Sequence, residues 1–288
     1  METTSTVSFF SIFSRAFRLY FRKFPFLFAL MIPSILGIHI LIIYIIWTLR
    51  IIGKILSYTF STNPNGLSPS PIPDVPSPSV ILFIGLAAFS FFAFLALLSK
   101  ASISHAVMAF EKNEPISFTT CLKKCFNNFF ASYLLSFLYY FIYLLIVISA
   151  AALFLQTFQP NIGLLYLGVF LFLTMQQLTL TFPVFIHESV SIWQAFRLSL
   201  KCAFKNFKKV FAISVICFLL YIPCGLILFG ILYFITTDLS PYQASLLITH
   251  PVVMSGYLIF GSLPVLWGIV TETLLYRDYK TDGYFNIT

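Results

Sequence analysis

Long apolar runs separated by shorter polar segments dominate this chain. A run of about 20 apolar residues is long enough to cross the hydrocarbon core of a bilayer as an α-helix. The sequence holds six such runs, at 24–47, 80–98, 130–155, 162–186, 210–235 and 252–275. We therefore predict an all-α fold, a polytopic membrane bundle of six transmembrane helices.

Three short stretches that mix apolar and basic residues each lead directly into a span. They cover 8–24, 116–129 and 190–209. In the third, apolar residues three and four positions apart form one stripe, which is typical of an amphipathic helix. A second stripe is basic: Arg197, Lys201, Lys205 and Lys208. Ser191 and Gln194 have the spacing of a capping box at its start. We expect these helices to lie in the membrane interface; the alternative is that they only cover the ends of the bundle.

The same three stretches resemble one another. Each ends in a step with phenylalanine at its first and fourth positions, at 21–24, 126–129 and 204–207, and each is followed by two predicted spans. We interpret the chain as a threefold repeat of amphipathic helix, span, outer loop and span, since internal repeats are common in membrane folds.

A segment rich in proline and serine separates the first two predicted spans. Residues 61–79 contain six prolines and too little apolar bulk to form a core, so they favour extended, polyproline-like conformations. We predict a flexible non-cytoplasmic loop; a proline-rich docking motif is the alternative.

Composition agrees with the membrane assignment. Of the 288 residues, 59% are hydrophobic and 9% are charged, whereas a soluble domain has about 25% charged residues. So few charges could not cover a water-soluble fold of this length, and we treat 1–288 as a single integral membrane domain. The first apolar run is longer than a signal-peptide core and has no small-residue cleavage site, so we expect it to be retained as a span.

Lysine and arginine are distributed unevenly between the two sides of the predicted bundle. Fifteen of the 17 lie at the termini or in the second-to-third and fourth-to-fifth connections, and only Arg50 and Lys54 lie on the other side. Because cytoplasmic segments carry the excess of cations, both termini are predicted to be cytoplasmic. With an odd number of spans, these 15 cations would no longer all lie on one side of the membrane.

The cations of the amphipathic stretches are the candidate contacts for lipid headgroups. They are Arg15, Arg18, Arg22, Lys123, Lys124, Arg197, Lys201, Lys205 and Lys208. A cation near an anionic leaflet contributes about 1 kcal/mol. We therefore expect membrane lipids of an anionic leaflet as partners, leave a protein partner open, and expect no nucleic acid.

Polar residues inside the predicted spans form a second candidate site, because they are costly in a bilayer and often functional. They are His39, Gln176, Gln177 and Glu188. For His39, packing competes with a proton relay, and for the glutamines interhelical hydrogen bonding competes with substrate binding. Glu188 is either an ionisable gate or a carboxylate favoured by the dipole of the helix that follows it.

The sequence contains none of the common motifs for catalysis, nucleotide binding or metal binding. It has no H-E-x-x-H, G-x-x-x-x-G-K-[ST] or G-x-S-x-G. Its five cysteines include no CxxC, which favours small apolar packing residues over a disulfide framework or a metal site. We expect no enzyme activity and no cofactor.

Two stretches resemble a known family. Residues 182–213 contain Pro183 and Glu188 at the close of a span, followed by A-F-R-L-S at 195–199, and residues 271–282 contain T-L-L-Y-R-D at 273–278. They resemble the six-span membrane domain attached to some bacterial glycerophosphodiester phosphodiesterases and also found alone. The resemblance implies a six-span topology in a bacterial-type inner membrane, and it implies no activity because the features of the catalytic domain are missing.

Two functions remain open at this point. The first is a non-enzymatic membrane module that binds lipid or a partner protein through its cytoplasmic helices. The alternative is a transporter or permease of a small amphiphile or lipid, with a path between repeats. A polar cavity reaching from the cytoplasmic face to Gln176 and His39 would favour transport, whereas a solid, apolar, aromatic-filled bundle interior would favour the binding module.

Overall fold

The computed structural model describes residues 9–61, 75–126, 129–157, 180–188, 190–236 and 251–283. All regular structure within these ranges is α-helical. The long helices are α2 (Phe24–Ser61), α3 (Pro78–Glu111), α5 (Phe129–Thr157), α9 (Phe207–Thr236) and α11 (Pro251–Thr281). The short helices are α1 (Phe9–Arg22), α4 (Phe118–Cys125), α7 (Thr181–Glu188) and α8 (Ile192–Lys205).

Several of the described helices are long and apolar enough to cross a membrane. Three qualify alone, within Phe24–Ile55, Pro78–Glu111 and Leu258–Thr281, and a fourth is added if α4 and the start of α5, bent by 84°, form one broken span. The predicted spans at 24–47, 80–98 and 252–275 fall on the first three. Those at 130–155 and 210–235 fall on α5 and α9. Most of 162–186 lies outside the described residues, so the count of six stays a prediction.

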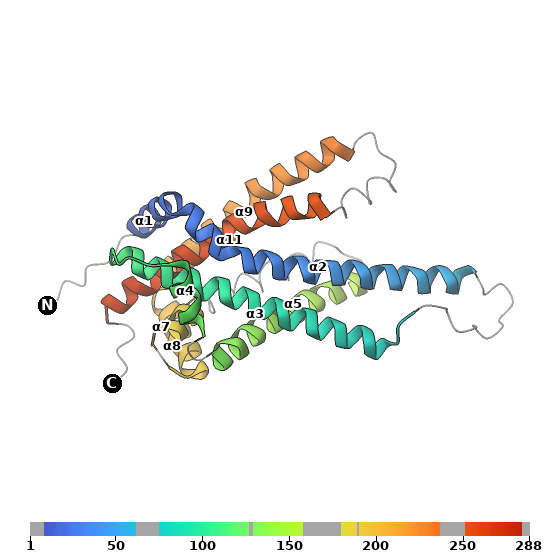
Figure 1. Ribbon diagram of the computed structural model, residues 1–288, viewed down its shortest axis with the longest axis horizontal. Helices are drawn as coiled ribbons and strands as arrows, with labels where there is room; N and C mark the ends of the chain where they lie inside the picture. The colour runs from blue at the N-terminus through green and yellow to red at the C-terminus, as the bar shows by residue number, and fades with distance from the viewer. Residues whose placement is uncertain are drawn as a thin grey trace.

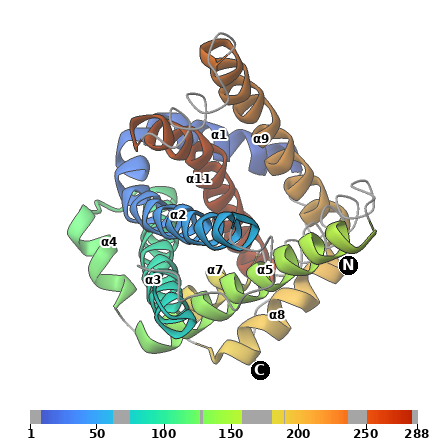
Figure 2. The same ribbon diagram turned by 90° about the vertical axis from the view of Figure 1, so that its right-hand side faces the viewer.

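The long and short helices meet at one end of the molecule. Helices α2 and α3 lie side by side along the long axis, and α1, α4, α7 and α8 gather at the end where α3 and α11 terminate (Figure 1). Along the long axis, α2 and α3 are seen nearly end-on while α1, α4 and α8 are seen lengthwise (Figure 2). Helices α1, α4 and α8 therefore run across α2 and α3.

Close packing joins α2 to α3. A Cβ added to Gly37 would lie 3.2 Å from the Phe92 Cα, so only glycine allows this approach without a shift. Pro33 lies inside α2 and removes one backbone donor. The Ser99 hydroxyl of α3 lies beside this position, accepts a hydrogen bond from the Ser34 amide at 2.9 Å and donates to the Met31 carbonyl at 3.5 Å. A neighbouring helix thus supports the backbone around the proline, as is usual in membrane bundles.

The buried core lies at the end where the short helices gather. Helix α11 is buried on nearly every side from Leu266 to Tyr279, which marks it as the central helix of this end. By contrast, the first turns of α3 expose large apolar side chains, among them Leu82 and Phe83. Such a surface is unfavourable in water and acceptable in lipid, which agrees with an integral membrane protein.

Two long helices continue further than their apolar runs predict. The second predicted span ends at residue 98 with Lys100 in the connection that follows, but α3 continues through Glu111 and Lys100 is helical. The last predicted span ends at residue 275, but α11 continues through Thr281 and includes Arg277. A span predicted from hydropathy ends at these polar residues, whereas in the structure each of them pairs with a residue on another helix.

Candidate functional site: the charged end of the bundle

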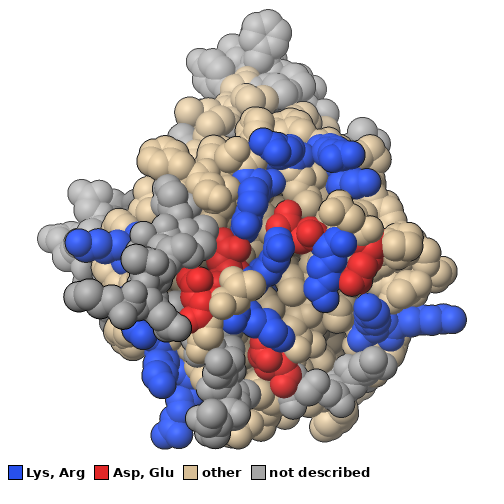
Figure 3. Space-filling view, turned by 90° about the vertical axis from the view of Figure 1, so that its left-hand side faces the viewer, with Lys and Arg blue, Asp and Glu red and all other residues tan. Residues whose placement is uncertain are grey.

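Lysine, arginine, aspartate and glutamate side chains gather on the end of the molecule formed by the short helices (Figure 3). Four ion pairs, called the α11 ion pairs below, join α11 to α1, α3 and α7. Their atoms are Arg15 Nη2 and Asp278 Oδ1 at 2.7 Å, Lys100 Nζ and Glu272 Oε2 at 3.0 Å, Lys280 Nζ and Glu188 Oε1 at 3.0 Å, and the pair Arg277–Glu111. Their carboxylates are largely buried. Because an unpaired buried charge is costly, we infer that these four carboxylates hold the helices together.

Lys100 is the most enclosed cation of the four pairs, with a side chain 12% exposed. Its Nζ also lies 4.9 Å from the centre of the Phe182 ring and 5.5 Å from that of Tyr139. A cation above an aromatic face is attracted by the ring quadrupole. Lys100 therefore connects α3 to α11, α7 and α5 at one point.

A polar cluster lies beside these pairs, between α3, α7 and α11. The buried Tyr276 donates a hydrogen bond to Glu188, and its ring stacks on His187 at 5.4 Å. The Nε2 atom of His187 lies 2.9 Å from the Ser104 hydroxyl, which accepts a further hydrogen bond from Thr273 at 3.2 Å. Burial, together with nearby His105 and lysine charges, lowers the pKa of His187 to about 3, so its imidazole is neutral near pH 7.

The chemistry available to this cluster is limited by its pairing. Glu188 is held by Tyr276 and Lys280, and the neutral His187 is held by Ser104. Among the described residues, no group of three or more His, Cys, Asp or Glu side chains could hold a metal ion. The cluster orders three helices, and we assign it no catalytic step.

Of the residues predicted to line a polar membrane site, the structure describes His39 and Glu188, and these two are not brought together. His39 lies in α2 next to Ile38, which packs on the cluster around Phe92 of α3. Glu188 ends α7, where the preceding histidine contacts Ser104 of α3. Residues 92 and 104 of one helix are about 18 Å apart along its axis, so His39 and Glu188 belong to different levels of the bundle. Gln176 and Gln177 lie outside the described residues. The dipole explanation for Glu188 is also incomplete, because its direct partners are Tyr276 and Lys280.

Eight of the nine predicted headgroup contacts have exposed side chains: Arg18, Arg22, Lys123, Lys124, Arg197, Lys201, Lys205 and Lys208. The ninth, Arg15, is half-buried and forms an ion pair with Asp278. The prediction for Arg15 therefore needs correction, because residues at 12, 16 and 20 form the buried face of α1 and carry Arg15 toward α11.

Helix α8 packs on the bundle through small side chains. The predicted capping box is confirmed: the Ser191 hydroxyl accepts from the Gln194 amide, and the Gln194 side chain accepts from the Ser191 amide. Ala195, Ser199 and Cys202 face inward. Burial raises the pKa of the Cys202 thiol to about 12. Large side chains, including Trp193 and Phe204, are left on the outside.

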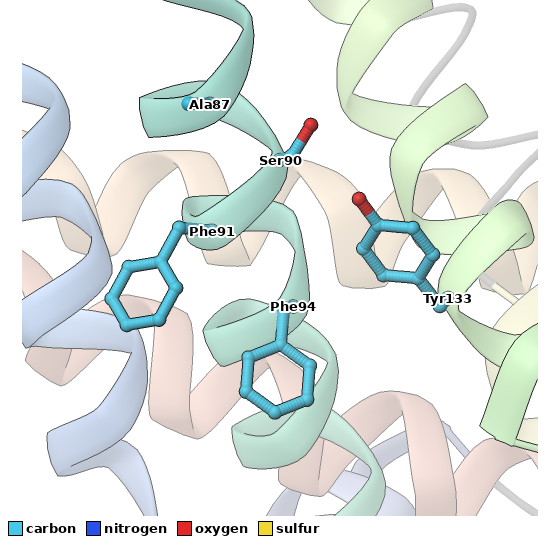
Figure 4. Close-up of a pocket in the computed structure, with 5 residues that line it drawn as sticks. All are labelled: Ala87, Ser90, Phe91, Phe94 and Tyr133. Carbon is cyan, nitrogen blue, oxygen red and sulfur yellow. The ribbon is translucent and has the colours of Figure 1, made fainter. Parts of the chain in front are cut away.

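The hollows on the described surface include one on α8 and one between α3 and α5. One of about 380 Å³ is on α8, lined by Trp193, Gln194, Phe196, Arg197 and Leu200. The other, of about 410 Å³, lies between α3 and α5 and is lined by Ala87, Ser90, Phe91, Phe94 and Tyr133. Its hydroxyl groups, on Ser90 and Tyr133, extend toward the gap between the two helices (Figure 4). It contains no ionisable group apart from the tyrosine, which suits contact with apolar chains better than catalysis.

Sequence reasoning did not identify the acidic partners Glu111, Glu272 and Asp278. A signal was present at the end of the last apolar run. Glu272, Tyr276 and Lys280 are spaced four residues apart, so they share one face of a helix whose earlier turns are largely apolar. Such a polar stripe on a buried helix indicates partners on neighbouring helices.

Comparison of the chain with protein-family models, with curated proteins and with solved structures found no match in any of the three. The interpretation of this end of the molecule therefore depends on its own geometry.

Proposed function

We propose that this chain is a non-enzymatic membrane protein that binds anionic lipid through α1, α4 and α8 at the cytoplasmic end of a six-span bundle in a bacterial-type inner membrane. The observation that carries the proposal is the combination of exposed cations and exposed aromatic side chains on three helices that run across the bundle. Amphipathic helices of this composition lie in the plane of an interface, with the apolar face toward acyl chains and the cations at the headgroups.

The step shared by the three repeats supports this arrangement. The short helix ends within the step at 21–24 and 204–207 and one residue before it at 126–129, and each long helix begins at the last phenylalanine of the step. The first phenylalanine of the step is 61% exposed at Phe21, 54% at Phe126 and 67% at Phe204. The same break and the same exposed ring at three places support a threefold unit of short crosswise helix and long helix. These rings would belong to the apolar faces of the interfacial helices, where tryptophan, phenylalanine and leucine are typical.

Packing beside His39 favours a binding module over a transporter. Phe92 of α3 contacts Tyr140 of α5 with ring centres 4.8 Å apart, and Phe89 contacts Phe137 at 5.4 Å. Ile38, next to His39, packs on the same cluster. Aromatic rings thus fill the contact between α3 and α5 at the level of the α2 turn that carries His39.

The resemblance to the six-span membrane domain is retained as part of this proposal. It rests on two stretches far apart in sequence, and Glu188 from one accepts a hydrogen bond from Tyr276 of the other. The two stretches are therefore in contact in the folded protein and join α7 to α11. This is compatible with the architecture of the six-span membrane domain and adds no activity.

We expect the proposed topology to be visible in cysteine labelling at α8. In a cysteine-free background, Lys201→Cys should react with a membrane-impermeant maleimide in inside-out vesicles and not in intact cells. The native Cys202, as the sole cysteine, should react at least 100-fold more slowly, because its raised pKa leaves little thiolate. Labelling of Lys201→Cys from the outer side would contradict the topology.

We expect anionic lipid to copurify with the full-length protein and to be lost when cations are removed. Substituting glutamine at Arg18, Arg22, Lys123, Lys124, Arg197 and Lys201 should lower the ratio of anionic to zwitterionic lipid, measured by mass spectrometry, at least tenfold, since each cation contributes about 1 kcal/mol. The matched control is glutamine at Arg50 and Lys54, which should leave the ratio unchanged. An equal ratio in all three proteins would refute lipid binding by these helices.

A further inference from the structure

We infer that α8 carries a binding site for one phospholipid with an anionic headgroup, formed by the hollow at Trp193, Phe196, Arg197 and Leu200 with Lys201 beside it. The inference rests on the proposed function and deepens it. It assigns a lipid to one helix and separates that site from the general attraction of the charged end for an anionic leaflet.

The hollow has an apolar lining with one cation. Its volume of about 380 Å³ falls within the range of small-molecule sites, about 300–1,000 Å³. Trp193 is 80% exposed, so its ring is available to a ligand. Gln194 also lines the hollow, but its side-chain oxygen accepts from the amide and the hydroxyl of Ser191, both at 3.1 Å. The oxygen of Gln194 is thus engaged within the helix cap, and the charged recognition group of the hollow is Arg197.

The order of the three faces of α8 matches the depth profile of a lipid. At about 100° per residue, the buried residues Ala195, Ser199 and Cys202 form one face. Next to it lies an apolar stripe of four large side chains, Trp193, Phe196, Leu200 and Phe204. Beyond that lies the basic stripe, which includes Arg197 and Lys201. An acyl chain on the apolar stripe would therefore have its phosphate beside the cations.

Charge on α8 favours an anionic ligand. The helix contains Arg197, Lys201 and Lys205 and no acidic residue. The carboxylate nearest before it in sequence, Glu188, is engaged by Tyr276 and Lys280. An arginine can give two parallel hydrogen bonds to a phosphate, and tryptophan combines a large apolar ring with a polar N–H, which suits the boundary between chains and headgroups. These groups together recognise a phospholipid better than a free phosphate, which would contact only the cations.

The test uses Trp193 as the reporter in the full-length protein. The chain has three tryptophans, so the substitutions Trp47→Phe and Trp267→Phe make Trp193 the single remaining tryptophan. The protein is placed in nanodiscs of phosphatidylcholine and phosphatidylglycerol, with bromine on the acyl chains of one lipid or the other. Brominated phosphatidylglycerol should quench Trp193 at least twofold more than brominated phosphatidylcholine at equal content. Arg197→Gln with Lys201→Gln should bring that ratio close to one, and the control Arg50→Gln with Lys54→Gln should not change it.

Other results would overturn the inference. If both lipids quench Trp193 equally, or if aqueous iodide quenches it in an anionic nanodisc, α8 holds no such site. The anionic enrichment of the whole protein can then still stand, so the two failures are distinguishable. If inorganic phosphate protects Trp193 from quenching by iodide as well as the lipid does, the site binds an anion and not a lipid. Should Trp267→Phe prevent folding, Trp47→Phe alone suffices, because the buried Trp267 contributes a constant background.

Discussion

Replacing Glu272 by glutamine should lower the free energy of unfolding by about 3–5 kcal/mol, the usual cost of removing one partner of a buried ion pair. The side chains of Lys100 and Glu272 are 12% and 19% exposed. Without the carboxylate, the Lys100 amino group would lie unpaired among the rings of Phe182 and Tyr139, where little water can solvate it. The measurement is unfolding of the purified protein in detergent, followed by circular dichroism during titration with a denaturing detergent.

The chain supplies a matched control for this substitution. Lys112 and Glu114 also form an ion pair, at 3.9 Å, but their side chains are 60% and 56% exposed. Exposed pairs contribute about 0–1 kcal/mol, so Glu114→Gln should change the free energy of unfolding by less than that. Adding Lys100→Met to Glu272→Gln should recover most of the lost stability, since no buried charge then remains. Equal effects of Glu272→Gln and Glu114→Gln would mean that the buried pair does not form.

Tyr276→Phe should destabilise the protein by about 1.5–3 kcal/mol, the range for a hydrogen bond to a charged group. The substitution keeps the buried ring on His187 and removes only the hydroxyl that donates to Glu188. Lys280→Met removes the other partner of Glu188, but that lysine is half exposed, and the expected loss is below about 1 kcal/mol.

A double-mutant cycle with Tyr276→Phe and Glu188→Gln isolates the interaction from other effects of either change. Residues in direct contact show coupling energies of about 0.5–3 kcal/mol, whereas distant residues are nearly additive. Additive effects would mean that the hydroxyl and the carboxylate are not in contact, and would remove the link between α7 and α11. The same denaturation experiment supplies all four free energies.

Together these substitutions separate two groups of charged residues at the same end of the molecule. Loss of an α11 ion pair should reduce stability, and loss of the exposed cations should reduce lipid enrichment with little effect on stability. Arg15 and Arg18 show the distinction within a single helix turn, because Arg15 pairs with Asp278 and Arg18 is exposed.

The sequence by itself determined the features that depend on neighbouring residues. Apolar runs placed the long helices, and the Ser191–Gln194 spacing placed the start of α8, because hydropathy and helix capping are local properties. The repeated Phe-x-x-Phe step also marked the three places where a short helix ends and a long one begins. None of these features requires knowledge of which helices are neighbours.

Only the tertiary structure decided which polar residues are engaged and which are exposed. Arg15 contacts Asp278, which is 263 positions away in the sequence, and Glu188 contacts Tyr276, which is 88 positions away. Lys100 can lie inside α3 because Glu272 of α11 lies opposite it. A charge is stable in a buried position only where packing places an opposite charge within contact distance. The arrangement of α1, α3 and α7 around α11 decides which charges meet, and hydropathy along the chain does not predict that arrangement.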